Sequence, residues 1–584
     1  MTASSAASKL DPTTQRATQP RGVQYTDTVA HRLAAGLKRH GVSCVFGQSL
    51  PSMLHLAGRD IGIKQIAYRQ ENTGGYMADA YARLSGQVGI VTAQNGPAAA
   101  LLTAPLLEAL KVSIPLIALV QDVNRDQTDR NAFQEIDHES LFKPCAKWVR
   151  RVTEASRIDD YLDMAFTAAT SGRPGPAVLL LPADLLIEPA PPASLRRASL
   201  GRYPLDRALP AATVLQEAAQ LLAQAKRPVV IAGGGVHLSD ASQELARLQE
   251  LASLPVATTV MGKGSVDERH PLSLGVATYF TGPNGGARYL KPLITDADVV
   301  LLVGNRTNQN GTDSWKLYPK EARFIHIDVE PMEIGRNYEA LRLVGDAKLT
   351  LAALADLMEH GDLTQRRNGR SAVEAAIRQG HDKHRTEVAG LVESNASPMR
   401  PERIMKEIDQ RLNGDSIVVA DASYSSIWVA NCMQSRRAGQ RFITPRGLAG
   451  LGWGFPMALG ARVAKPKADI FCVVGDGGFG HAWVELETAV RMKLRVVLVV
   501  LNNGILGYQK HAENVKFGDF TDACDFVPVD HAAIARAVGA QGINVEKAAD
   551  LGPALDKALA SDLVTLIDVR TDPDAFPPVS WYEV

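Results

Sequence analysis

Two short polar runs in the C-terminal third of the chain carry residue types that bind Mg²⁺ and diphosphate. Gly475–Gly478 (Gly-Asp-Gly-Gly) follows the apolar run Phe471–Val474, and Asn502–Gly504 (Asn-Asn-Gly) follows the apolar run Val496–Leu501. Twenty-four residues lie between Gly477 and Asn502, which is the length of one strand–helix–strand crossover. Because ligands of parallel sheets bind at the carboxyl ends of the strands, we expect both runs to face one site.

The side chains in these runs suit that chemistry. Asp476 offers a carboxylate oxygen and Asn503 an amide oxygen, and Mg²⁺ prefers such oxygens together with phosphate oxygens. Gly475, Gly477 and Gly478 let backbone N–H groups approach a diphosphate, and the predicted helix after them adds the positive end of its dipole. An isolated Gly-Asp-Gly turn is common in loops, so the prediction depends on the spacing of the two runs.

A second set of candidates lies in the N-terminal third. Glu71 follows a short apolar strand and begins a predicted helix whose Gly74, Gly75 and Ala78 allow close packing. Taken alone, a glutamate in this place interacts with the helix dipole. Four glutamines are candidates for contacts with a substrate: Gln48, Gln94, Gln134 and Gln509. Each could equally be an exposed or structural residue, and for Gln509 that alternative is favoured.

Together these segments resemble the thiamine-diphosphate enzymes related to acetolactate synthase and pyruvate oxidase. The signature of that family is Gly-Asp-Gly, then about 24 to 27 residues, then Asn-Asn. The resemblance extends over residues 23–570 and includes a glycine-rich run from Gly447 to Gly460. It implies thiamine diphosphate and Mg²⁺ as cofactors, with Asp476, Asn503 and the backbone carbonyl of Ile505 as metal ligands.

The resemblance also implies roles for other residues. Glu71 resembles the glutamate that exchanges a proton with the aminopyrimidine ring of the cofactor, and burial would raise the pKa of such a group. Leu451 matches an apolar residue that keeps the cofactor bent, although plain helix packing explains it equally well. Tyr424 and Ser425 are further expected cofactor contacts, and Gln48 and Gln134 are expected catalytic residues. In relatives the glutamate reaches the cofactor of a partner subunit, so a homodimer or homotetramer is implied.

The elements that must position these residues alternate between strand and helix. Near-continuous apolar runs such as Val299–Val303, separated by Ala/Leu-rich amphipathic stretches, indicate parallel sheets covered on both faces. The expected fold is α/β with three doubly wound parallel-sheet domains. Their expected bounds are 23–188 for a pyrimidine-binding domain, 205–360 for a central domain and 400–570 for a diphosphate-binding domain.

The remaining segments are polar or rich in proline. Residues 1–22 are rich in Ser, Thr and Ala without an apolar stretch, and are predicted to be a disordered tail. Residues 361–399 are charged and poor in β-forming residues, which indicates a linker that carries a surface helix. Residues 571–584 form a C-terminal tail, whose Ser580 and Trp581 resemble part of a closing segment.

Composition excludes several classes of protein. Lys plus Arg and Asp plus Glu both number 63, so no overall positive charge favours nucleic acid or an anionic membrane. The 5 cysteines are scattered, which argues against a disulfide framework or a structural zinc site and fits a reducing cytoplasm. No apolar run reaches the roughly 20 residues of a membrane span. We therefore expect a cytoplasmic enzyme that acts on a small molecule.

The resemblance leaves the reaction open. Acetolactate synthases carry a tryptophan where this chain has Ala512, and their flavin-binding Asp-Asp-Arg run is replaced by Gly304–Gly311. Arg306 with Asn308, and the residues after Gly478, resemble the oxalyl-CoA decarboxylase and 2-hydroxyacyl-CoA lyase branch instead. The expectation is a carbon–carbon lyase or carboligase acting on 2-oxo acids, with an acyl-CoA lyase or a non-catalytic cofactor-binding subunit as alternatives. Whether the central domain binds FAD or ADP stays open.

Overall fold

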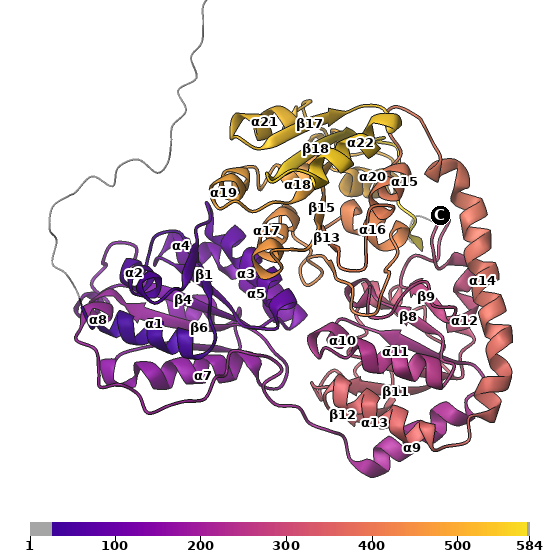
Figure 1. Ribbon diagram of the computed structural model, residues 1–584, viewed down its shortest axis with the longest axis horizontal. Helices are drawn as coiled ribbons and strands as arrows, with labels where there is room; N and C mark the ends of the chain where they lie inside the picture. Colours follow the sequence, from indigo (N-terminus) through magenta and orange to yellow (C-terminus); the bar gives the residue numbers. More distant parts are fainter. Residues whose placement is uncertain (1–25, 581–584) are drawn as a thin grey trace, which may run out of the picture.

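A computed structural model describes residues 26–580 as three α/β domains, each built on a six-stranded parallel sheet (Figure 1). The predicted fold class is therefore confirmed. The predicted tail at residues 1–22 and Trp581 lie outside the described residues. All 5 cysteines are described and none is paired in a disulfide. No helix within residues 26–580 is long and apolar enough to cross a membrane.

The first domain has the strand order β2-β1-β3-β4-β6-β5. Each central strand buries both faces: Ile90 of β3 packs into one hydrophobic cluster, whereas its neighbour Val91 packs into another on the opposite face. The strands are β1 Cys44–Phe46, β2 Lys64–Ile66, β3 Gly89–Ala93, β4 Leu116–Asp122, β5 Trp148–Arg151 and β6 Ala177–Pro182. The helices are α1 Val29–Arg39, α2 Ser52–Asp60, α3 Glu71–Ser85, α4 Pro97–Leu101, α5 Thr103–Val112, α6 His138–Phe142, α7 Ile158–Thr170 and α8 Ala183–Ile187.

The middle domain has the order β12-β11-β10-β7-β8-β9, so the direction of strand addition reverses between β7 and β10. Such a reversal opens a crevice at the carboxyl ends of the two strands, where ligands of open α/β sheets bind. The strands are β7 Pro228–Ala232, β8 Val256–Thr258, β9 Ser273–Val276, β10 Val299–Val303, β11 Arg323–Asp328 and β12 Ala340–Val344. The helices are α9 Ala212–Gln224, α10 Gly235–Leu238, α11 Ser242–Leu251, α12 Pro292–Thr295 and α13 Ala347–Glu359.

The third domain, with the order β14-β13-β15-β16-β18-β17, repeats the relative strand order of the first. The strands are β13 Ile417–Ala420, β14 Phe442–Ile443, β15 Ile470–Gly475, β16 Val497–Asn502, β17 Gln541–Val545 and β18 Thr565–Arg570. The helices are α15 Pro401–Asp409, α16 Tyr424–Cys432, α17 Gly454–Ala464, α18 Asp476–Phe479, α19 Glu485–Arg491, α20 Gly507–Phe517, α21 His531–Ala537 and α22 Ala548–Leu559. The single helix expected after Gly478 is thus two helices, α18 and α19, with turns between them.

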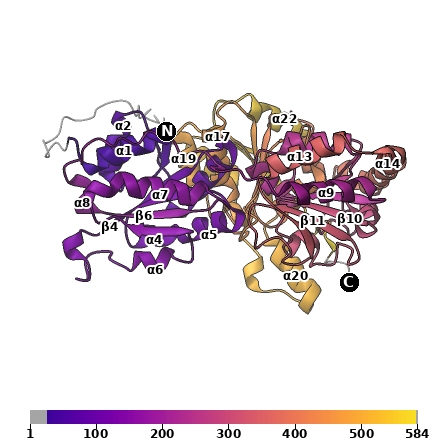
Figure 2. The same cartoon turned by 90° about the horizontal axis from the view of Figure 1, so that it is seen from below.

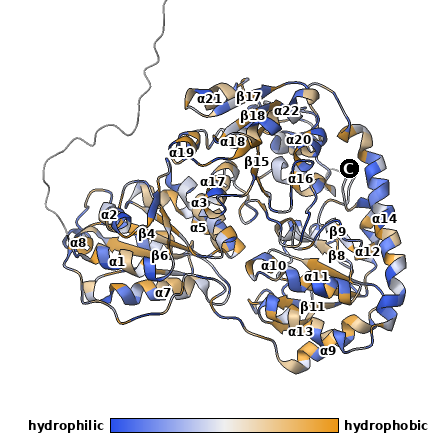
Figure 3. Ribbon diagram, in the orientation of Figure 1, coloured by the Kyte–Doolittle hydropathy of each residue, from blue (hydrophilic) through white to orange (hydrophobic). Residues whose placement is uncertain are grey.

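A long helix, α14 (Thr364–Val392), runs along the outside of the molecule from the middle domain to the third (Figure 1). Its surface is largely hydrophilic (Figure 3), as its charged sequence predicts. Arg366 is buried and donates hydrogen bonds to the carbonyls of Ala225 and Ser253, which fixes the start of α14 on the middle domain. The helix lies within the predicted linker 361–399; the exact domain bounds stay predictions.

The first and third domains meet through α3 and α17, the helices that follow the second strand of each sheet. Gly460 of α17 lies so close to α3 that an added Cβ would be 2.0 Å from the carbonyl oxygen of Met77. Tyr76 and Trp453 stack beside this contact with their ring centroids 4.2 Å apart. Of the small residues predicted to allow close helix packing, Gly74 and Gly75 lie against Tyr68 and Pro105 within the first domain, while Gly460 makes the close approach between domains.

Candidate active site

A cavity of about 610 Å³ lies at the carboxyl end of the third sheet. We call it the Asp476 cavity. The metal and cofactor candidates of the third domain all lie on its wall: Tyr424, Ser425, Leu451, Gly475, Asp476, Gly477, Gly478, Asn503 and Ile505. Gln509 lies there too. The two polar runs therefore face one site, as their spacing predicts.

The two strand ends are joined by a hydrogen bond. The backbone N–H of Gly504 donates to the Asp476 carboxylate at 2.7 Å, and the N–H of Gly477 donates to its other oxygen at 2.9 Å. Gly504 has a φ of +72°, a conformation that glycine adopts without strain and that turns the chain back toward Asp476. Asn502 instead points into the domain, where its amide donates to Asp568 at 2.9 Å, so the two asparagines have different tasks.

The oxygens on this wall fit a Mg²⁺ ion that also binds phosphate. Burial raises the pKa of the Asp476 carboxyl to about 6, and its hydrogen bonds to Gly504 and Gly477 oppose that rise. A bound cation would stabilise the buried carboxylate further. Residues 26–580 contain no cluster of three or more His, Cys, Asp or Glu that could hold a metal. A site made of one carboxylate, one amide and one carbonyl suits Mg²⁺, because phosphate oxygens complete its shell.

Small residues from the start of α16 and from the turn after Asp476 line the cavity. Ser423 has a φ of +64° and directly precedes α16, and Ser425 is buried in the first turn of that helix. A Cβ added at Gly478 would be 2.1 Å from the Asp421 carboxylate, so no side chain fits at that position. Tyr424 contacts His511 at 2.8 Å. Small residues on both sides leave room for a ligand against the backbone.

Carboxylates hold both ends of the loop that carries Leu451. The buried Asp421 accepts hydrogen bonds from the N–H groups of Gly452, Trp453 and Gly454 at 2.9 to 3.0 Å. At the other end, Glu108 of the first domain accepts from Gly447 and Leu448 at 2.9 and 2.6 Å. The structure therefore places Leu451 on the cavity wall in a loop whose backbone is fixed.

The candidates of the first domain form a separate group at the carboxyl edge of the first sheet. Gln94 donates to the side chain of Gln134 at 2.5 Å, so these two glutamines contact each other. Gln48 donates to the carbonyl of Arg69 at 3.2 Å, two residues before Glu71. Glu71 begins α3, as predicted. All four candidates thus lie on one edge.

Glu485 fixes the start of α3. Its buried carboxylate accepts hydrogen bonds from the N–H groups of Arg69 and Gln70 at 3.1 and 3.2 Å and from the Thr73 hydroxyl at 2.6 Å. Burial raises the pKa of the Glu71 carboxyl, and the negative charge of Glu485 raises it further. Such a raised pKa suits a carboxyl group that exchanges a proton with a ligand.

One chain does not bring the two groups of candidates together. The described residues that line the Asp476 cavity come from the third domain, with Asn310 from the middle domain, and none comes from the first. Glu71 therefore lies outside the Asp476 cavity of its own chain. The anchoring roles of Asp421, Glu108 and Glu485 could not be predicted from the sequence, because their partners are backbone groups distant in sequence. Asp421 was the one of the three that its position could have indicated, because it directly follows the strand that ends at Ala420, where ligands of parallel sheets bind.

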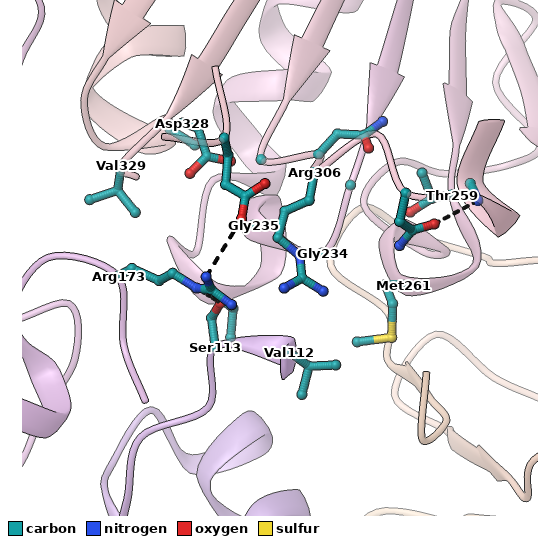
Figure 4. Close-up of a pocket in the computed structure, with 18 of the residues that line it drawn as sticks. Val112, Ser113, Arg173, Gly234, Gly235, Thr259, Met261, Arg306, Asp328 and Val329 are labelled. Carbon is teal, nitrogen blue, oxygen red and sulfur yellow. Dashed lines mark hydrogen bonds and ion pairs between the residues drawn. The ribbon is translucent and has the colours of Figure 1, made fainter. Parts of the chain in front are cut away.

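A second cavity, of about 330 Å³, lies over the reversal point between β7 and β10 (Figure 4). We call it the Arg306 cavity. Gly233, Gly235 and Gly304 line it, and their backbones approach so closely that a Cβ on Gly233 would be 2.2 Å from the Gly304 carbonyl oxygen. The glycines lack the dinucleotide-binding spacing, yet they lie where nucleotides bind in open α/β sheets.

Cations face this second cavity. Figure 4 shows Arg173 of the first domain and Arg306 of the middle domain reaching into it. Arg173 lies 3.6 Å from Glu333, whereas Arg306 makes no hydrogen bond or ion pair with any residue between 26 and 580. Burial lowers the pKa of Arg306, and the nearby positive charge of Arg173 lowers it further. Asp328 ends β11 in the same cavity, and burial raises its pKa to about 6.

Comparison with protein families finds three matching domains. The N-terminal TPP binding domain of thiamine pyrophosphate enzymes matches residues 27–141, and the central domain matches residues 215–354. The C-terminal TPP binding domain matches residues 421–569, which include Asp476 and Asn503. TPP, thiamine pyrophosphate, is another name for thiamine diphosphate.

Curated relatives match nearly the whole chain. A probable acetolactate synthase large subunit of Methanococcus aeolicus is 32% identical over 528 residues, 87% of this chain and 85% of the relative. An acetolactate synthase of Arthrospira platensis is 32% identical over 572 residues, 95% of this chain and 96% of the relative. A glyoxylate carboligase of Escherichia coli O157:H7 is 30% identical over 542 residues, 90% of this chain and 89% of the relative.

Proposed function

Because the chain belongs to the thiamine pyrophosphate enzyme family, and is thus a thiamine-diphosphate-dependent enzyme, we propose that it is a Mg²⁺-dependent carboligase that joins 2-oxo acids as acetolactate synthase does. The observation that carries the proposal is the Asp476 cavity, where one carboxylate and one amide from adjacent strand ends meet beside glycines. Relatives named as acetolactate synthases and as a carboligase support the reaction class.

In this proposal the residues of the third domain bind the cofactor. Asp476, Asn503 and the carbonyl of Ile505 hold Mg²⁺, Gly475–Gly478 with Tyr424 and Ser425 surround the diphosphate, and Leu451 supports the rings. When bound, thiamine diphosphate supplies the carbon nucleophile and stores the electron pair released by decarboxylation. The chain's own contribution is to hold the ligand in one orientation against the strand ends.

Glu71 completes the site from a second copy of the chain. Within one chain it lies on a different sheet edge from Asp476, so the proposed proton exchange with the aminopyrimidine ring requires a partner subunit. Gln48, Gln94 and Gln134 lie on the same edge of the first domain as Glu71. We propose that they reach the substrate side of the shared site in a homodimer or homotetramer, with residues 23–188 and 400–570 as the two halves of the site.

Product analysis tests the reaction directly. We expect the protein with thiamine diphosphate and Mg²⁺ to convert pyruvate to acetolactate and CO₂, as followed by NMR, and to lose this activity when a chelator removes the metal. The control is a parallel sample with a 2-hydroxyacyl-CoA. Formyl-CoA and an aldehyde or ketone from that sample, with no product from pyruvate, would contradict the proposal and assign the chain to the acyl-CoA lyases instead.

The Arg306 cavity supports a bound nucleotide. We propose that Arg306 and Arg173 bind the phosphates of an adenine nucleotide, FAD or ADP, and that Asp328 accepts hydrogen bonds from its ribose. Replacing Arg306 with Gln is expected to weaken nucleotide binding about 10-fold or more, because a charge-assisted contact is lost. Titration calorimetry with FAD, ADP and CoA measures this; no binding of any of the three to the unmodified protein would contradict the proposal.

A further inference from the structure

The wall of the Asp476 cavity carries mostly negative charge. Four acidic residues line it, Asp421, Asp476, Glu513 and Asp572, and the Asp572 carboxylate lies 3.0 Å from the Arg400 guanidinium, which does not line the cavity. Arg446 is the only Lys or Arg among the described residues that line it. A substrate that brings a carboxylate of its own is repelled by such a wall unless a cation is placed to receive it. Among the described residues on this wall, Arg446 is therefore the one side-chain cation that can receive such a carboxylate.

The guanidinium of Arg446 is held by one of its three nitrogens, and the other two have no hydrogen-bond partner among the described residues. One terminal nitrogen, Nη2, donates to the hydroxyl of the buried Tyr279 at 2.7 Å, and the guanidinium carbon lies 5.9 Å from the centre of the Tyr279 ring. The other two nitrogens, Nε and Nη1, form no hydrogen bond with any residue from 26 to 580. A guanidinium has five N–H donors in a planar fork that matches a carboxylate, so this one retains binding capacity.

The backbone of Arg446 is fixed before any ligand binds. The two residues after it, Gly447 and Leu448, donate to the Glu108 carboxylate of the first domain, while Tyr279 holds the side chain from the middle domain. Tyr279 is itself fixed, since its backbone carbonyl accepts from Ser580 at 2.9 Å. Residues of three domains thus determine the position of the Arg446 guanidinium on the wall of the Asp476 cavity. The guanidinium is therefore in place before a substrate binds, and binding does not have to order it.

We propose that the Arg446 guanidinium binds the carboxylate of an acidic substrate in the Asp476 cavity and so selects acids over their uncharged analogues. The identity of that acid as a 2-oxo acid rests on the proposed function. Arg446 and Asn310 also line the Arg306 cavity, so the phosphate of a nucleotide is the rival partner for this cation. Arg306, which lines the Arg306 cavity but not the Asp476 cavity, offers a matched comparison.

The test is equilibrium binding by titration calorimetry on the assembled protein with thiamine diphosphate and Mg²⁺, in the Glu71→Gln background so that ligands are not consumed. The ligands are pyruvate, its uncharged methyl ester and ADP. Arg446→Gln is expected to weaken pyruvate binding about 10- to 100-fold, the effect of losing charge-assisted hydrogen bonds, and to leave the ester within about twofold. Arg446→Lys should lie between, since it keeps the charge and loses the fork.

Two further variants complete the comparison. Tyr279→Phe removes only the anchoring hydroxyl and is expected to weaken pyruvate binding about threefold. Arg306→Gln is expected to weaken ADP binding and to leave pyruvate binding unchanged. Equal loss for pyruvate and its ester in Arg446→Gln, a loss confined to ADP, or no pyruvate binding before the substitution would each overturn the inference.

Failure of this inference can be told apart from failure of the proposed function. If pyruvate binding depends on Arg446 but the unmodified protein forms no acetolactate, the inference about Arg446 is supported and the proposed reaction is contradicted. Acetolactate formation with an unchanged KM for pyruvate in Arg446→Gln keeps the reaction and removes the inference. The KM readout uses chains with an intact Glu71, whereas the calorimetry uses the Glu71→Gln background, so each Arg446 variant is prepared in both forms.

Discussion

Replacing Glu71 with Gln is expected to lower turnover of pyruvate by about 10²- to 10⁴-fold while thiamine diphosphate still binds. The amide has the shape of the carboxyl but cannot exchange a proton with the aminopyrimidine ring. Cofactor binding persists because the Mg²⁺ and diphosphate ligands proposed here lie in the third domain. Turnover is measured by acetolactate formation, and cofactor affinity by titration calorimetry.

The pH dependence gives an independent readout for Glu71. Because burial and the negative charge of Glu485 raise the pKa of this carboxyl, the acidic limb of the kcat profile should lie above the ordinary glutamate pKa of about 4.3. That limb should disappear in Glu71→Gln. The control is Glu217→Gln, the same change at an exposed position of α9, which should leave the profile unchanged. Full turnover in Glu71→Gln would remove the proposed role.

Mixing two inactive variants is expected to restore activity. Random pairing of Glu71→Gln chains with Asp476→Ala chains gives mixed dimers in half of the cases, and each has one intact site of two, so about a quarter of the wild-type activity should return. The intact site combines Asp476 from the first variant with Glu71 from the second. A site contained in one chain would stay inactive in every pairing.

The mixing experiment needs proof that chains have paired. Co-expression with two different affinity tags, followed by purification over both, isolates the mixed dimers, whose activity should reach about half that of the wild type. The matched control pairs Glu71→Gln with the double variant Glu71→Gln/Asp476→Ala, in which no site is complete. Activity absent from the doubly purified dimers would contradict a site shared between subunits.

Much of the fold and half of the candidate site followed from the sequence. Buried parallel strands such as Val299–Val303 are continuous apolar runs of five or six residues, and their length and their valine content distinguish them from the amphipathic helices. The shorter strands Cys44–Phe46 and Phe442–Ile443 gave no such signal, because two or three residues do not define a period. The spacing from Asp476 to Asn503 correctly placed these two residues on one cavity wall, since a crossover of fixed length brings adjacent strand ends together.

The residues that hold the site could not be found in this way. Asp421, Glu108 and Glu485 act by accepting hydrogen bonds from backbone groups, and the accepting residue leaves no motif in the donating segment. Glu108 lies 339 positions before Gly447, and Glu485 lies 416 positions after Arg69. Arg446 stands outside every signature segment named from the sequence. The role proposed for Arg446 depends on the acidic residues around it, which come together only in the folded cavity.

The loop from Gly447 to Gly454 has a consequence for how the site opens. Its amides at Gly447, Leu448 and Gly452–Gly454 are bonded to two carboxylates, so their hydrogen exchange requires a charged contact to break and should be slow. Another part of the cavity wall is formed by α20, which contributes Gly507–Gln509 and Glu513. This helix projects from the body of the molecule (Figure 2) and leaves Val515 and Phe517 exposed. We therefore expect hydrogen exchange at the bonded amides of the loop to be slower than in α20, and a comparison of the two segments measures which part of the wall opens more readily.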